Sequence, residues 1–452
     1  MNKSIDFTEG NLLKQMISFS IPIFLTNILQ ISYQVVDSMW VGRLVGSHAL
    51  GAVAISGSVL FAILSFIIGI NGVTLTVLSQ QRGKKDEEGL KESLNAFVVI
   101  LAALTLIMGL VGYLLTDPIL RWLGTPPDLF PLASSYLHIN FMGILFLFGY
   151  NFIGTVLRAM GDSRTPLRFV WMAVILNAMI NPIFIDTFSW GIEGSAYATI
   201  VSQGLAFIYG VAYCIRSGKV PFVRPYLPSM LYIKTIIRLG IPAGLQMLAI
   251  SAGMTAIIAV VTSHGQSVVS GFGAANRIES MLLIPSYTLS SVVNSMAGQN
   301  IGAGRWDRVA QITKLGLMVI VSLKLLLGGF VFLFSDMLIR IFVSDPATVA
   351  FGAYYLKTVA FFYVFLGINF VLNGVVRASG AMLAVLVLNL ISFWLLRFPL
   401  VYFFSELWGD QGLPLGTGIS LMLSSLIASA YFYMGNWRKK KLFQKDDKRV
   451  SA

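Results

Sequence analysis

Long apolar runs separated by short polar segments follow one another along almost the whole chain. These runs are long enough to cross a hydrocarbon core about 30 Å thick as α-helices. They lack the alternation of apolar and polar positions that marks the strands of a transmembrane β-barrel. The pattern predicts an all-α membrane protein with twelve transmembrane helices, at 14–38, 50–78, 94–115, 133–158, 168–188, 194–215, 235–262, 272–298, 314–334, 351–377, 383–404 and 414–436.

The basic residues are distributed unevenly among the connections. Of the 32 Lys and Arg residues, 25 lie in the even-numbered connections, at the span ends that border them and at the two termini, whereas the odd-numbered connections hold only Arg43, Arg121 and Arg340. Cytoplasmic loops of membrane proteins carry the excess of positive charge. We therefore expect a multi-pass protein of the cell's inner (cytoplasmic) membrane with both termini in the cytoplasm. The net charge of +12 then reflects topology and contact with anionic lipid, and no nucleic-acid partner is expected.

The second half of the chain weakly repeats the first with an offset near 220. The matching pairs include Pro22 and Pro242, Gly51 and Gly271, Tyr136 and Tyr355, and Arg158 and Arg377. Six helices per repeat place both halves in the same orientation, so we expect two six-helix bundles related by a pseudo-two-fold axis along the membrane normal. The predicted parts are an N-lobe (1–215), a cytoplasmic linker (216–234), a C-lobe (235–437) and a basic cytoplasmic tail (438–452).

Asp37 is the most informative charged residue inside the predicted helices. An ionisable residue within a membrane span is costly and marks an ion or substrate pathway, and a desolvated carboxylate can exchange protons near neutral pH. We interpret Asp37 as a proton or cation site. The alternative is a buried aspartate that caps a helix end. Three polar residues share its helix face one or two turns back and are expected to line a substrate cavity: Gln30, Tyr33 and Gln34.

Asn177 and Asn181 lie one turn apart on the fifth predicted helix and are followed by Pro182. The proline frees a backbone carbonyl one turn earlier, which can coordinate a cation or let the helix bend. Three further residues can complete an oxygen-rich pocket: Tyr136, Asn151 and Thr199. On composition alone, hydrogen bonding between helices is the favoured role, because amides commonly join membrane helices.

Other polar positions in the spans leave alternatives open. Lys324 lies near the middle of the ninth helix, where it faces a cavity, pairs with an acid, or shows that the span boundary is misplaced. Arg277 and Glu279 are expected to form a pair at the membrane interface. Pro22, inside the first helix, is expected to act as a hinge.

Several classes of function lack their sequence signals. The chain has no phosphate-binding Gly-rich loop followed by Lys and Ser or Thr, and no clustered His and Cys residues, so neither ATP hydrolysis nor a metal centre is expected. Its single cysteine, Cys214, excludes an internal disulfide. We expect no enzyme activity and no cofactor, and active transport would have to be driven by an ion gradient.

Several motifs resemble those of the multidrug and toxic compound extrusion (MATE) family. They are Pro22 followed fifteen residues later by Asp37, Leu50-Gly51-Ala52, Leu157-Arg158-Ala159-Met160-Gly161-Asp162, Ala274-Ala275-Asn276-Arg277-Ile278 and Gly298-Gln299-Asn300-Ile301-Gly302. The resemblance implies a monomer that exports bulky, lipophilic, cationic small molecules in exchange for protons or sodium. It also implies a cation pocket formed by Asp37, Tyr136, Asn151, Asn177, Asn181 and Thr199.

The chain departs from this family pattern in two places. Many members have Asn-xxx-Asp-Pro in the fifth helix, whereas this chain has Asn177-xxx-Asn181-Pro182, so one carboxylate is missing. Sodium would lose half of the formal charge of its site, and proton coupling is favoured. The seventh helix is apolar around Ile250, where the NorM-like branch has a glutamate, so the chain resembles the DinF-like branch more closely.

The principal alternative within the same architecture is a flippase for a lipid-linked saccharide. Such a protein is expected to have a cation-rich lateral groove for pyrophosphate, for which only Arg277, Lys324 and Arg397 are candidates. A membrane-embedded enzyme would need several acid, base or metal-binding groups at one depth, and a channel would need a filter or a ring of charges. The sequence favours an antiporter over these alternatives.

Overall fold

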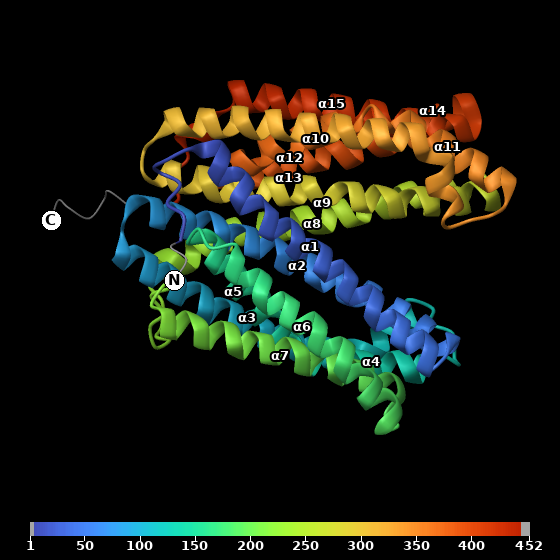
Figure 1. Cartoon of the computed structure of the whole chain (residues 1–452), viewed down its shortest axis with the longest axis horizontal. Coiled ribbons are helices and arrows are strands. Elements are labelled where there is room, and N and C mark those ends of the chain that lie inside the picture. The colour runs from blue at the N-terminus through green and yellow to red at the C-terminus, as the bar shows by residue number, and fades with distance from the viewer. Residues whose placement is uncertain (1–3, 444–452) are drawn as a thin grey trace. The chain divides into compact units, whose positions relative to one another are not determined.

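The computed structural model describes residues 4–443, and every regular element in this range is a helix (Figure 1). The first half of the chain contains α1 (Leu12–Leu44), α2 (Ser47–Lys84), α3 (Glu87–Trp122), α4 (Phe130–Met142), α5 (Ile144–Ala159), α6 (Arg164–Pro182), the π-helix η1 (Ile183–Thr187) and α7 (Gly191–Ser217). The second half contains α8 (Met230–Thr262), α9 (Gln266–Gly302), α10 (Trp306–Arg340), α11 (Pro346–Ala360), α12 (Tyr363–Ala378), α13 (Met382–Leu390), the π-helix η2 (Ile391–Arg397), α14 (Phe398–Trp408), η3 (Gly409–Gln411), α15 (Gly412–Met434) and η4 (Asn436–Lys439).

These helices confirm the prediction of a membrane protein with twelve spans. In the part of the chain that the structure describes, eight helical segments are long and apolar enough to cross a membrane, and two bent helix pairs raise the number to ten. One of the eight, Met382–Met434, is 53 residues long and holds two predicted spans, the second of which is α15. The twelfth span is α9, which is 37 residues long but more polar than the others.

Two predicted spans are bent. The fourth bends by 51° between α4 and α5, and the tenth bends by 53° between α11 and α12, at corresponding places in the two halves. The first bend lies at Gly143, where a Cβ atom would collide with Ile200 of α7. Glycine therefore lets the bend pack closely against α7, which a uniformly apolar sequence pattern does not reveal.

The chain divides into two compact units. Within the described residues, the first unit comprises 4–6 and Ile17–Ile237, and the second comprises Phe7–Met16 and 238–443. In the first unit, apolar side chains of α1, α2, α4, α5 and α7 form a core that includes Tyr136. In the second unit, side chains of α8 to α12, α14 and α15 form a core that includes Tyr355 and Tyr363.

Large apolar side chains are also exposed on the outer helices. On α3, Leu106, Leu110 and Leu114 are 62–65% exposed. On α10, Leu326 and Leu333 are each 72% exposed. A soluble protein rarely exposes such rows of leucine, and in a multi-pass membrane protein they contact the lipid chains.

The motif residues Gln299 and Asn300 hold the N-terminal segment of the second unit. The Gln299 side-chain oxygen accepts a hydrogen bond from the Phe7 backbone N–H at 3.2 Å, and the Asn300 amide donates to the Phe7 carbonyl at 3.0 Å. Arg308 donates to the same carbonyl at 3.0 Å. This part of the family motif therefore has a structural role at the end of α9.

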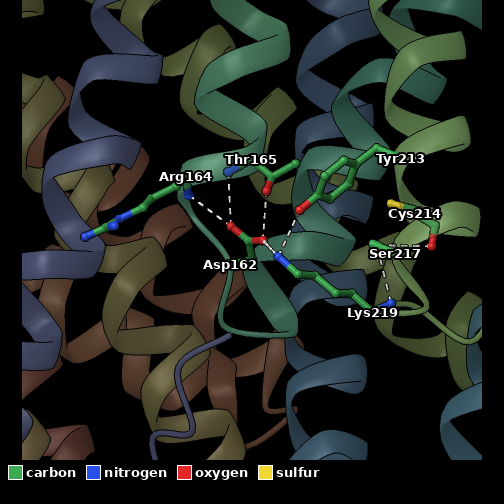
Figure 2. Close-up of polar contacts among 7 residues, drawn as sticks. All are labelled: Asp162, Arg164, Thr165, Tyr213, Cys214, Ser217 and Lys219. Atoms are coloured by element: carbon green, nitrogen blue, oxygen red, sulfur yellow. Dashed lines mark hydrogen bonds and ion pairs between the residues drawn. The ribbon is translucent and has the colours of Figure 1, made fainter. Parts of the chain in front are cut away.

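Asp162, which follows α5, ties the α5–α6 turn to the chain after α7 (Figure 2). Its carboxylate accepts hydrogen bonds from the Thr165 backbone N–H at 3.0 Å and from Lys219 Nζ at 2.8 Å. Lys219 also donates to the Tyr213 hydroxyl at 2.9 Å. Burial by itself would raise the pKa of Asp162, but the hydrogen bonds from Lys219 and Thr165 outweigh it and hold this pKa below its ordinary value.

We expect Asp162→Asn to lower the free energy of unfolding at neutral pH by on the order of 1 kcal/mol, because charge-assisted hydrogen bonds are lost. A carboxyl group whose pKa is lowered by folding stabilises the protein above its unfolded-state pKa, and this contribution disappears as the pH falls through the folded-state pKa. The deficit of the variant should therefore shrink in acid. Cys214 is buried and is the single cysteine, so its reaction with a maleimide dye during heating reports unfolding. Asp336→Asn is the control, since Asp336 is 57% exposed and should give no deficit.

Candidate functional site

The buried carboxylate of Asp37 lies at the centre of a hydrogen-bond network in the first unit. Asp37 is 7% exposed, although it lies within the long membrane helix α1. Its Oδ1 atom accepts a hydrogen bond from Asn181 Nδ2 at 2.9 Å and another from Ser195 Oγ at 2.8 Å. Two neutral donors from two other helices, α6 and α7, thus bind the Asp37 carboxyl oxygen.

The network continues from Asp37 along α6 and back to α7. Asn181 Nδ2 also donates to Asn177 Oδ1 at 3.1 Å, one helical turn away. Asn177 Nδ2 in turn donates to Thr199 Oγ1 at 3.3 Å. Both asparagines are fully buried. The amides therefore join helices, as their composition suggests, and also surround the carboxylate.

Two tyrosines lie at the edge of the network. Tyr136 of α4 is buried and neighbours the Asp37 carboxyl. The Tyr33 hydroxyl lies 2.9 Å from Ser202 Oγ, and Ser202 Oγ donates to the Thr199 carbonyl at 3.0 Å. Because the Ser202 proton is used in that bond, Tyr33 is the donor to Ser202.

Three other predicted residues make no hydrogen bond to this network among the contacts that the structure describes. The Asn151 amide donates to the Leu147 carbonyl of its own helix at 2.8 Å. Gln34 is exposed, and Gln30 is half-buried near Tyr150. Their predicted roles in the cation pocket and the substrate cavity stay predictions.

Sequence reasoning missed Ser195 and Ser202. Both lie on the face of α7 that also presents Thr199, with spacings of four and three residues. This stripe of hydroxyl groups in an apolar helix was the available signal. Ser195 is the more important omission, because it makes one of the two direct hydrogen bonds to Asp37.

The network of Asp37, Asn181, Asn177, Ser195 and Thr199 contains one carboxyl group, two amides and two hydroxyl groups. Within residues 4–443, no group of three or more His, Cys, Asp or Glu side chains could hold a metal ion. The Asn181 side-chain oxygen is buried and has no hydrogen-bond partner among the described residues. The arrangement can therefore hold one negative charge or one proton, with an additional acceptor available beside it.

Two polar residues of the second unit differ from expectation. The expected pair of Arg277 and Glu279 is wrong: Arg277 lies 5.6 Å from the centroid of the Phe342 ring, and Glu279 accepts a hydrogen bond from Tyr363. Residues two positions apart on a helix do not face each other. Lys324 lies well inside α10, far from either end of the helix, and is fully buried.

The sequence model of the MatE family matches residues 22–183 and again residues 242–403. The two matches together cover more than half of the chain. The chain belongs to the MATE family. Both matches begin and end 220 positions apart, which agrees with the predicted internal repeat, and membership places the chain among transporters and not enzymes.

Named relatives and solved structures agree with this assignment. The chain is 53% identical to the probable multidrug resistance protein YpnP of Bacillus subtilis (strain 168), over 98% of this chain and 99% of the relative. It is 29% identical to the probable multidrug resistance protein YoeA of the same organism, over 95% of each chain. The fold matches the crystal structure of the Vibrio cholerae MATE transporter VcmN in the bent form with a TM-score of 0.89 and 22% identity, over 96% of this chain and 99% of that chain. Placement in the DinF-like branch stays a prediction.

Proposed function

We propose that this MATE family protein is a secondary active multidrug efflux transporter. It exports lipophilic, cationic small molecules across the inner membrane in exchange for protons, by alternating access, as a monomer with both termini in the cytoplasm. Two lines of support are the relatives named multidrug resistance proteins and the uneven distribution of basic residues. The observation that carries the coupling mechanism is the buried Asp37 carboxylate with its two neutral donors.

Proton binding at Asp37 changes the hydrogen-bonding requirement of the site. The carboxylate accepts bonds from Asn181 and Ser195, whereas a protonated carboxyl also has a proton to donate. Rotation of the Asn181 amide would present its unpartnered oxygen to that proton. The same amide can therefore serve both states, with loss of its bond to Asn177 in the protonated one.

This change links the proton to the substrate. In the deprotonated state, the negative charge of Asp37 favours a cationic substrate in the same unit. Protonation removes that attraction and rearranges the bonds that join α1 to α6. Because each ligand weakens binding of the other, inward movement of protons drives outward movement of substrate.

A proton suits the site better than sodium. Asn181 occupies the position at which many family members have a second carboxylate, so a sodium ion would meet one negative charge among neutral oxygens. Proton exchange requires only Asp37 and an acceptor for its hydrogen. We therefore assign the coupling ion as H⁺.

Pro22 is the proposed bending point of α1. It lies inside a continuous 33-residue helix, and proline cannot donate to the carbonyl one turn earlier. The Thr26 hydroxyl donates to the Pro22 carbonyl at 2.7 Å, a bond that also favours helix bending. A change of hydrogen bonding at Asp37 can be transmitted along α1 to this point.

The residues proposed for a flippase groove give that alternative no support. Lys324 is fully buried, Arg397 is 8% exposed, and Arg277 packs over Phe342. An anionic pyrophosphate group would require cations that are gathered and accessible.

Ethidium efflux from proteoliposomes tests the proposal. A proton gradient and a sodium gradient are imposed separately on vesicles containing the wild-type protein, with protein-free vesicles as the control. We expect efflux with the proton gradient alone. Efflux driven only by sodium would contradict the assignment of the ion, and no gradient-driven efflux of any lipophilic cation would contradict the proposed function.

A further inference from the structure

A cluster of charged side chains lies inside the second unit and has no role in the mechanism above. Three residues form this charge cluster: Glu279 of α9, Lys324 of α10 and Arg397 of η2. Lys324 is fully buried, Arg397 is 8% exposed and Glu279 is half-buried. Charges in such positions within a membrane protein are costly and mark functional sites by default.

Neutral groups make the direct hydrogen bonds to the charge cluster. Lys324 Nζ donates to the backbone carbonyl of Leu282. Glu279 accepts from the Tyr363 hydroxyl at 3.2 Å, and Arg397 Nε donates to Ser420 Oγ at 3.3 Å.

The three charged groups also interact at longer range. Arg397 and Lys324 both act electrostatically on the Glu279 carboxylate. Within residues 4–443, however, no ion pair of 4.0 Å or less joins either cation to Glu279. The buried ammonium of Lys324 is therefore compensated only in part.

The numbers of acidic and basic groups in the charge cluster do not balance. With all three ionised, one acid and two bases leave one positive charge inside the bundle, and an uncompensated buried charge costs several kcal/mol. Loss of one proton makes the cluster neutral. Arginine keeps its proton, and protonation of Glu279 would add to the excess positive charge, so loss of the Lys324 proton is the step that makes the cluster neutral.

The internal repeat relates one member of the charge cluster to the Asp37 network of the first unit, whereas Glu279 and Lys324 align with Val59 and Leu104, outside that network. The constant offset of 220 between the two family matches aligns Arg397 with Asn177. The repeat also aligns Tyr136, which lies beside Asp37, with Tyr355. Tyr355 neighbours both Glu279 and Arg397. In each unit the helix concerned also contains a π-helix, η1 or η2, a feature that occurs often at functional sites.

The surroundings of Lys324 define what else can influence its proton. Helix α10 packs against α9, α11 and α12. The titratable groups that these helices and η2 present to the cluster are Glu279, Tyr355, Tyr363 and Arg397. Gly367 of α12 leaves room for the lysine stem, because a Cβ atom there would lie 3.1 Å from Lys324 Cγ.

We propose that Glu279, Lys324 and Arg397 form a second proton-exchange site, at which the amine of Lys324 gains and loses the proton. One N–H bond breaks on release and the proton passes to water, leaving a neutral amine that still donates to the Leu282 carbonyl. The consequence for transport rests on the proposed function: one further proton moves in each exchange cycle.

A difference titration of the purified protein tests the site itself. The proton uptake of Lys324→Met is subtracted from that of the wild type across the neutral pH range. Lys357→Met is the matched control, because Lys357 is an exposed lysine of α11. We expect a difference of one proton for Lys324→Met and none for the control. A flat difference curve for Lys324→Met would overturn the proposal, and the result does not depend on any transported substrate.

The coupling ratio tests the link to transport. The number of protons exchanged per ethidium is measured in proteoliposomes from the potential at which efflux stops. We expect the ratio to fall by one in Lys324→Met and also in Lys324→Arg, whose guanidinium keeps its proton. An unchanged ratio in both variants would overturn the proposal while the function proposed for Asp37 stands. If the wild type shows no proton-driven efflux, the proposed function fails and the difference titration alone decides on Lys324.

Discussion

Asp37→Asn is expected to reduce proton-driven ethidium efflux to the rate of vesicles without protein. Asparagine has nearly the same shape as aspartate and can keep a hydrogen bond to Ser195 or Asn181, so the helices should pack as before. It cannot bind and release a proton, and it has no charge with which to attract a cationic substrate. The measurement is dye efflux from proteoliposomes under an imposed proton gradient.

Two further variants separate coupling from folding in this experiment. Asp37→Glu keeps a carboxylate near the two donors and should retain part of the activity. Asp336→Asn removes an exposed carboxylate that pairs with Arg340 on α10, and it should transport like the wild type. Proton-driven efflux at the wild-type rate in Asp37→Asn would show that another group couples the proton.

Asn181→Asp should make the site responsive to sodium. The new carboxylate would lie about 3 Å from Asp37, and two carboxylates at this distance cannot both stay ionised without a cation between them. Sodium binding to the folded state should therefore stabilise the variant. We expect a rise in Tm of several degrees when sodium chloride replaces choline chloride, and no comparable rise for the wild type.

The matched control for this variant is Asn389→Asp, which introduces a carboxylate on α13 of the second unit, where the Asn389 amide donates to the Val385 carbonyl one turn earlier. It should show no stabilisation specific to sodium. The absence of a sodium effect in Asn181→Asp would mean that the oxygen ligands around Asp37 do not suit the metal, even with two negative charges. In that case, the presence of Asn181 in place of a second carboxylate would not explain why the protein uses protons instead of sodium.

The sequence was sufficient to predict the transmembrane helices, because an apolar run must reach a minimum length to cross the hydrocarbon core. It was insufficient for the bends within the fourth and tenth spans. The bend at Gly143 depends on close packing against Ile200, a tertiary contact that hydropathy does not report. The higher polarity of α9 did not prevent its prediction, since no charged residue interrupts the helix between Glu279 and Gly302.

In the site, too, residue spacing along one helix could be predicted from the sequence, whereas contacts between helices could not. Helical spacing correctly put Asn177 and Asn181 on one face, and the structure brings both to Asp37. Ser195 was missed because a small hydroxyl side chain is common in membrane helices and gains meaning only beside the carboxylate.

Lys324 and Glu279 lie far apart in the sequence. Their shared environment follows from the packing of α9 against α10, so sequence reasoning could only leave the role of Lys324 open. The expected pair of Arg277 and Glu279 does not form, because side chains two positions apart on a helix point to different sides.

Release of protons on ethidium binding shows whether substrate and proton compete at Asp37. Ethidium is added to purified protein in weakly buffered detergent solution, and a pH-sensitive dye counts the protons released by the wild type and by Asp37→Asn. We expect the wild type to release one proton more than the variant, because substrate and proton compete at Asp37. Equal release by the two proteins would contradict it.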